Sequence, residues 1–125
     1  MIDTLKWSRI ECEGSLPCRR NMHAAEVIQG GQQLIVMGGA TNGDQLADSN
    51  STLQLYKLDL QAKQWSHVEC NGQIPANRFG MSCIKYGNKL LMFGGMSTGG
   101  QFFNDVNVLD TGNYVQAVII PIGYI

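Results

Sequence analysis

The chain has 125 residues, 44% of them apolar, and a formal net charge of −1, a balance that excludes an intrinsically disordered protein. Charged residues make up only 15%, which excludes a coiled coil, and nine basic against ten acidic residues leave no basic surface for nucleic acid or membrane. Glycine is enriched, at 15 residues, and predicts a protein of strands and tight turns.

Short stretches with the character of strands follow one another along the chain, each bounded by turn residues. Residues 1–12 are predicted to hold a leading outer strand that contains Trp7. A first unit of four strands is then predicted over four stretches: residues 23–29, 34–37, 52–59 and 65–70. Residues 81–86 and 90–93 repeat the first two of these strands, and in both units a glycine-containing turn predicts an antiparallel hairpin.

The two units form an internal repeat. Trp7 and Trp65 are 58 residues apart, and four further pairs keep that offset: Cys12 and Cys70, Gly14 and Gly72, Pro17 and Pro75, and Arg20 and Arg78. The second glycine of each diglycine, Gly39 and Gly95, is offset by only 56, so two residues are lost in between. We expect the loss in the turn between the first two strands, because turns tolerate changes of length. A period near 57 predicts a repeat architecture.

The order of features within a unit resembles the kelch repeat: an apolar run ending in Gly38-Gly39, then Tyr56 with Leu58-Asp59, then Trp65. The resemblance implies an all-β fold of kelch-like β-propeller blades. It divides the chain into repeat 1 at residues 13–70, an incomplete repeat 2 at 71–111, and a divergent apolar tail at 112–125. Propellers have about four to eight blades of about 50 residues, so about two four-stranded antiparallel blades would leave the ring open.

Residues that occupy the same place in both units are predicted to be structural rather than functional. They are Trp7 and Trp65, Arg20 and Arg78, and the glycine pairs Gly38, Gly39, Gly94 and Gly95. One catalytic pattern occurs, because residues 95–99 read G-x-S-x-G, but no histidine follows His67 to complete a hydrolase triad in chain order. We therefore expect no catalytic residue, no cofactor, no metal site and no enzyme.

The resemblance implies a protein-interaction module, with a role as scaffold or adaptor for a protein partner that the sequence does not identify. In antiparallel blades the loops between strands two and three share one face with the loops between blades. Residues without a counterpart in the repeat are the candidates there: Arg19, Asn42, Asp44, Gln45, Phe102 and Phe103. Either phenylalanine could instead fold back onto its blade.

Other functions stay open. The loss of the pattern after Thr111, with Gln116 at the place of the next tryptophan, suggests a truncated fragment or isoform of a larger kelch protein without independent function. A propeller enzyme is the more distant alternative. Apolar blade faces without a neighbour predict self-association. Because the start shows no signal peptide and no apolar stretch has transmembrane length, we expect a cytoplasmic or nuclear location without membrane contact.

Overall fold

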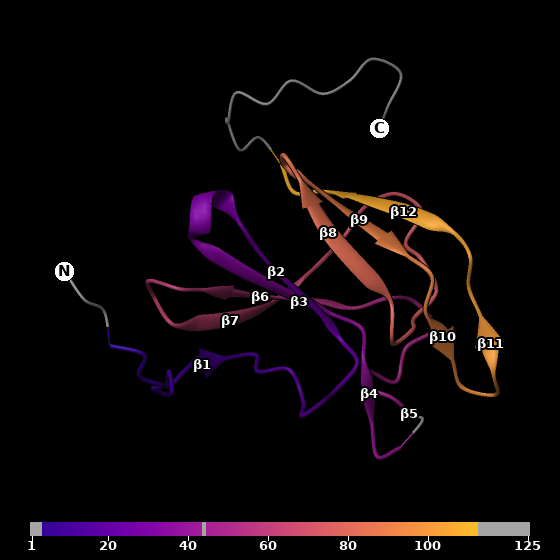
Figure 1. Cartoon of the computed structure of the whole chain (residues 1–125), viewed down its shortest axis with the longest axis horizontal. Coiled ribbons are helices and arrows are strands. Elements are labelled where there is room, and N and C mark those ends of the chain that lie inside the picture. Colours follow the sequence, from indigo (N-terminus) through magenta and orange to yellow (C-terminus); the bar gives the residue numbers. More distant parts are fainter. Residues whose placement is uncertain (1–3, 44, 113–125) are drawn as a thin grey trace.

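The computed structural model describes residues 4–43 and 45–112, which form two larger sheets and two small hairpins (Figure 1). The first sheet has the order β1-β7-β6-β3-β2, with strands β1 (Glu13–Gly14), β2 (Ala24–Ile28), β3 (Gln33–Met37), β6 (Leu55–Asp59) and β7 (Gln64–Val68). The second has the order β12-β9-β8, with strands β8 (Ser82–Tyr86), β9 (Lys89–Phe93) and β12 (Val106–Asp110). The hairpins pair β4 (Ala40–Thr41) with β5 (Gln45–Leu46), and β10 (Met96–Ser97) with β11 (Gln101–Phe102).

The predicted fold class is confirmed. Strands β2, β3, β6 and β7 are antiparallel neighbours in chain order, as a four-stranded blade requires. Strands β8, β9 and β12 repeat the first three of them, and the two sheets do not close into a ring. The tail predicted at 112–125 lies outside the described residues except for Gly112.

The first hairpin of each blade shows where the repeat loses two residues. Ala24 pairs with Met37 in the first blade, and Ser82 pairs with Phe93 in the second, so the offset changes from 58 to 56 across this hairpin. A two-residue turn joins β8 to β9, as predicted. The link from β2 to β3 is longer and forms a 3-10 turn, η1 (Gln29–Gly31), in place of the tight turn expected at Gly30-Gly31.

The leading strand expected over residues 1–12 is not formed by residues 4–12, the part of this segment that the structure describes. Residues 4–12 pair with no other segment of the described chain, and Trp7 is 97% exposed where a packed side chain was expected. The repeat explains the difference. Its counterpart β7 is held by β6, the third strand of the same blade, whereas no third strand of the described residues lies beside the leading segment. A strand without a pairing partner gains no ladder hydrogen bonds and buries no side chain.

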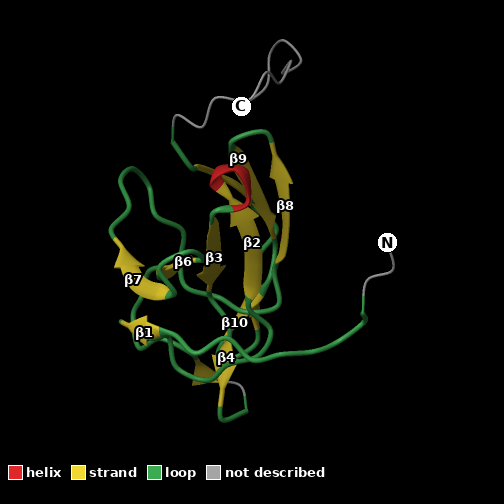
Figure 2. Ribbon diagram, turned by 90° about the vertical axis from the view of Figure 1, so that its left-hand side faces the viewer, coloured by secondary structure: helices red, strands yellow, loops and turns green. Residues whose placement is uncertain are grey.

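The hydrophobic core lies between the two blades, and Figure 2 shows β8 and β9 beside β2. Successive side chains of a strand point to opposite faces, so alternate residues enter this interface. The buried cluster contains residues of both blades and of the loops between them: Ala24, Ile28, Ile35, Met37, Leu53, Leu55, Met81, Leu90 and Met92. Neither blade has a core of its own of this size, so each blade depends on the other.

Glycine is required after β3 because the chain there takes a left-handed conformation against the second blade. Gly38 has φ +63°, and a Cβ at this position would contact the side chain of Met81 and lie 2.6 Å from the carbonyl oxygen of Arg78. The next residue, Gly39, has φ +114° and donates its backbone N–H to that same carbonyl at 3.0 Å. The first glycine pair therefore lets the two blades approach each other closely.

Replacing Gly38 by alanine is predicted to lower the free energy of unfolding by about 2–4 kcal/mol, because backbone strain adds to crowding against the second blade. The matched control is Gly72→Ala, since Gly72 has φ +85° but no atom within 4 Å of the new Cβ. That control is expected to cost about 1 kcal/mol, from strain alone. Urea unfolding followed by circular dichroism measures both, and equal losses would contradict the close approach.

Candidate functional site

The hairpins β4–β5 and β10–β11 lie at the same end of the two blades (Figure 1). The loop that joins the blades reaches the same end, because antiparallel strands return the chain there after β7. We call this surface the loop face and define it as residues 15–23, 38–54, 71–80 and 94–105. The described part of the loop face is the candidate binding surface.

A buried arginine organises the loop face in the first blade. The guanidinium of Arg20 donates to both carboxylate oxygens of Asp48, at 3.1 and 3.2 Å, and to the backbone oxygens of Gly38 and Cys18. The side chains of this pair are 4% and 9% exposed. Burial lowers the pKa of Arg20, but the hydrogen bond and charge of Asp48 outweigh it and raise that pKa overall. One side chain therefore ties three loop segments together.

The second blade repeats this arrangement. Arg78 donates to both carboxylate oxygens of Asp105, at 2.6 and 3.2 Å, and to the backbone oxygens of Gly94 and Ala76. Its side chain is 1% exposed, whereas that of Asp105 is 44% exposed. The hydrogen bond from Arg78 and, as the next largest cause, the one from Asn107 lower the pKa of Asp105 to about 2.

An aromatic ring covers each of these arginines. The guanidinium of Arg20 lies 5.2 Å from the centre of the Tyr56 ring, and that of Arg78 lies 3.9 Å from the centre of the Phe103 ring. Burial, together with the hydrogen bond that its hydroxyl donates to Asp48 at 2.9 Å, raises the pKa of Tyr56. Phe103 is thus half-buried against its own blade. This is the arrangement in which the phenylalanine folds back onto its blade instead of standing exposed.

A longer loop in the first blade is bound to the second blade. Six more residues separate Asp48 from β6 than separate Asp105 from β12. Within this insertion Thr52 forms a β-bridge with Ala76. The side chain of Asn77, which is 3% exposed, donates to the backbone oxygens of Asp48 and Asn50 at 2.9 and 3.1 Å. These bonds fix the loops of the two blades relative to each other.

Two hollows mark the described loop face. A groove of about 330 Å³ runs past Met22, Phe93, Phe102 and Phe103 and is closed by the backbone of Gly94 and Gly95. The side chains of Phe102 and Met22 are 75% and 49% exposed. A polar recess of about 400 Å³ lies between the hairpins, lined by Gln45, Leu46, Asp48, Ser49, Asn50 and Thr98. The surface thus offers an apolar groove beside hydrogen-bonding groups.

The six predicted binding residues fall into groups according to which of the two hollows, if either, they line. Phe102 and Phe103 line the groove, and Gln45 lines the polar recess. Arg19 and Asn42 are exposed on loops of the same face but line neither hollow, and Asp44 lies outside the described residues. Sequence reasoning missed Met22 and the two aspartates of the arginine pairs. The two aspartates lie 57 residues apart, which was a usable signal because it matches the period of the repeat.

The predicted structural residues are placed as follows. The side chains of Arg20 and Arg78 are buried in the loop bonds, Trp65 is half-buried in β7, and Trp7 is exposed. Every glycine of the two pairs has a positive φ: 63° at Gly38, 114° at Gly39, 72° at Gly94 and 99° at Gly95.

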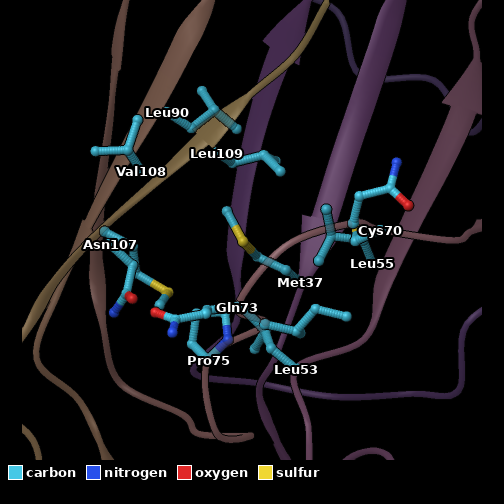
Figure 3. Close-up of a pocket in the computed structure, with 13 residues that line it drawn as sticks. Met37, Leu53, Leu55, Cys70, Gln73, Pro75, Leu90, Asn107, Val108 and Leu109 are labelled. Atoms are coloured by element: carbon cyan, nitrogen blue, oxygen red, sulfur yellow. The ribbon is translucent and has the colours of Figure 1, made fainter. Parts of the chain in front are cut away.

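A cavity between the blades is lined mostly by apolar side chains (Figure 3). In the close-up, Leu90 and Leu109 face Met37 and Leu55 across it. Its volume of about 70 Å³ is far below the roughly 300 Å³ of a small-molecule site, so we interpret it as imperfect packing of the core.

In the part of the chain that the structure describes, no group of three His, Cys, Asp or Glu could hold a metal ion. Within residues 4–43 and 45–112, no helix has the length and apolar character of a membrane span. Ser97 of the G-x-S-x-G pattern pairs with Gln101 in the β10–β11 hairpin, whereas a hydrolase nucleophile lies between a strand and a helix.

Comparison with known families matches residues 1–124 to the KLHDC2/KLHL20/DRC7 kelch-repeats domain. Host cell factor homolog hcf-1 of Caenorhabditis elegans is 26% identical over 110 residues, 87% of this chain and 13% of that protein. Tip elongation aberrant protein 1 of Schizosaccharomyces pombe is 32% identical over 110 residues, 88% and 9% of the two chains. An F-box/kelch-repeat protein of Arabidopsis thaliana is 30% identical over 95 residues, 76% and 19%. The chain therefore spans less than a fifth of these relatives.

The Arg78–Asp105 pair predicts a pH dependence of stability. The pKa of Asp105 is 3.8 ordinarily and about 2 in the fold, so its contribution is complete above 3.8 and is lost as the pH falls toward 2. Asp105→Asn is expected to lower the free energy of unfolding by about 1–3 kcal/mol at pH 6 and by less than half of that at pH 2. Urea unfolding measures both. Glu69→Gln, on a side chain that is 94% exposed, is the control, and a constant difference for Asp105→Asn would contradict the pair.

Proposed function

Because this chain belongs to the kelch-repeat family, whose domains are in general protein-interaction modules, we propose that it binds a protein partner through its loop face. Binding requires no chemistry from the module itself, so we propose a non-catalytic role as scaffold or adaptor. The observation that carries the proposal is the apolar groove on a loop face whose loops are fixed by buried arginines.

Phe102 is the first anchor that we propose. The repeat places it at the position of Leu46 in the first blade, and Leu46 is half-buried where the second blade packs beside the first. A position equivalent to Leu46 therefore stays partly accessible even with a neighbouring blade in place. An aromatic side chain that is 75% exposed at such a position is available to fill a pocket on a partner.

Met22 is the second anchor, and its backbone supports that role. Its φ of 56° is left-handed, and its counterpart in the second blade is Gly80, with φ 73°. A methionine in this conformation costs about 1–2 kcal/mol that a glycine avoids. Local strain of this kind clusters at functional sites, and here it presents a flexible apolar side chain to the groove.

The polar recess supports specificity more than affinity. Gln45 and Thr98 come from the two different hairpins and line the recess together. Asn77 fixes the loop that follows Gln45, so little ordering entropy is lost there when a partner docks. We propose that a partner places an apolar side chain in the groove and hydrogen-bonds into the recess. A cytoplasmic or nuclear location remains a prediction from the sequence.

The test is a comparative pull-down from cell extract with the immobilised 125-residue chain, quantified by mass spectrometry. Phe102→Ala is expected to reduce capture of the specific partner at least tenfold, because it removes the proposed anchor. Met22→Gly is expected to reduce capture while lowering the free energy of unfolding by no more than about 1 kcal/mol, since glycine relieves the strained φ.

The control variant is Gln61→Ala, on the exposed turn between β6 and β7, which lies at the opposite end of these strands from the loop face. It is expected to capture the same proteins as the unchanged chain. The proposal fails if every captured protein binds Phe102→Ala and Met22→Gly as well as it binds the control.

A further inference from the structure

The polar recess of the loop face carries hydrogen-bonding groups that the fold does not use. The side chains of Gln45, Ser49, Asn50 and Thr98 line the recess and are exposed. Within residues 4–43 and 45–112, none of these four side chains forms a hydrogen bond with another group. The amide of Asn77, in contrast, donates to two backbone oxygens and ties loops together. The amides and hydroxyls of the recess are therefore available to a ligand.

The recess lies where the loops of the two blades meet. Gln45 belongs to the β4–β5 hairpin of the first blade, and Thr98 lies in the turn of the β10–β11 hairpin of the second. The backbone of Asn50 is held at both of its polar groups, because its N–H donates to the Asp48 carbonyl at 2.9 Å and its carbonyl accepts from Asn77 at 3.1 Å. The recess thus rests on contacts within this pair of blades, and a partner meets loops that are already ordered.

The described residues of the recess offer a partner no unpaired charge. Asp48 is the one ionisable residue among them, and its side chain is 9% exposed. Its carboxylate accepts from the guanidinium of Arg20 at 3.1 and 3.2 Å and from the hydroxyl of Tyr56 at 2.9 Å. A charged group of a partner would therefore lose water in the recess without gaining a counter-ion. The recess favours a polar group that carries no charge.

The side chains of the recess are matched to peptide groups. The amides of Gln45 and Asn50 each combine an acceptor oxygen with a donor NH2 group, and the hydroxyls of Ser49 and Thr98 both donate and accept. A carboxylate only accepts and an ammonium or guanidinium group only donates, so each would use half of these groups. A peptide group presents one N–H and one C=O, so it forms two hydrogen bonds with a single side-chain amide. Every exposed segment of a protein partner carries such groups.

We propose that the recess binds the main chain of an extended, uncharged segment of the protein partner, and that the amides of Gln45 and Asn50 hold its peptide groups. The inference rests on the proposed function, because it names the part of the partner that the loop face recognises. Side chains at the bound positions of the segment are then exchangeable as long as they carry no charge. Proline is excluded there, because it has no backbone N–H to donate.

The test selects short random peptides on the immobilised 125-residue chain and measures the affinity of the most enriched peptide by fluorescence anisotropy. Each backbone nitrogen of that peptide is then methylated in turn, which removes an N–H and leaves the side chains unchanged. Methylation is expected to weaken binding about tenfold or more at one or more positions, because a hydrogen bond to the recess is lost. Alanine at the same position is expected to change the affinity less than about threefold.

Two isosteric variants test the amides themselves. Gln45→Glu and Asn50→Asp each replace a donor NH2 group by a carboxylate oxygen that faces the carbonyl of the bound peptide group, and each is expected to weaken binding about tenfold or more. The matched control is Gln101→Glu, the same change at the same place in the second hairpin, since Ser97 pairs with Gln101 as Thr41 pairs with Gln45. Gln101 is exposed but lines neither hollow, so this variant is expected to bind unchanged.

Phe102→Ala separates failure of this inference from failure of the proposed function, because Phe102 does not line the recess. The inference is overturned if Gln45→Glu and Asn50→Asp bind the enriched peptides as tightly as Gln101→Glu does, or if alanine costs more than methylation at every position. It is also overturned if the positions sensitive to methylation carry charged side chains, or if the library yields no peptide. Peptides that bind Phe102→Ala as well as every recess variant would contradict the proposed function in addition.

Discussion

The apolar interface between the two blades is the contact on which the other features of the structure depend. The buried side chains come from both sheets at once, so each sheet buries its apolar face only against the other. The left-handed glycine pair after β3 exists to let the blades meet, because it accepts the close approach of the Arg78 carbonyl. Without this packing the loops at the end of the blades would have no fixed relation to one another.

The loops of the loop face are held on the two packed blades by the same set of arginine hydrogen bonds in each blade. Each buried arginine joins the loop before its blade, the glycine pair after the second strand and an aspartate before the third strand. Only the coverings differ, with Tyr56 above Arg20 and Phe103 above Arg78. Because the scaffold is repeated in both blades, the features that differ are those that we propose for recognition. These are the exposed side chains of Phe102 and Met22 and the recess between the hairpins.

The sequence could predict what depends on the period and on local pattern. The strands, their antiparallel order and the position of the two-residue loss followed from residues such as Trp65 and Gly38 and their partners in the repeat. It failed where the outcome depends on a distant partner. Trp7 carries the same local signal as Trp65, but among the described residues a third strand lies beside Trp65 alone. Met22 carries no recognisable motif, and its strained conformation became evident only beside its counterpart Gly80.

Native-state hydrogen exchange tests most directly whether the two blades hold each other together. It is measured at a concentration at which the chain is monomeric, on the central strands β3 and β9. The account predicts that the slowest amides of both strands exchange with the same opening free energy, and that Leu90→Ala lowers both equally by about 2–4 kcal/mol. Amides of β9 that exchange several kcal/mol more easily than those of β3, or a Leu90→Ala effect confined to the second blade, would contradict it.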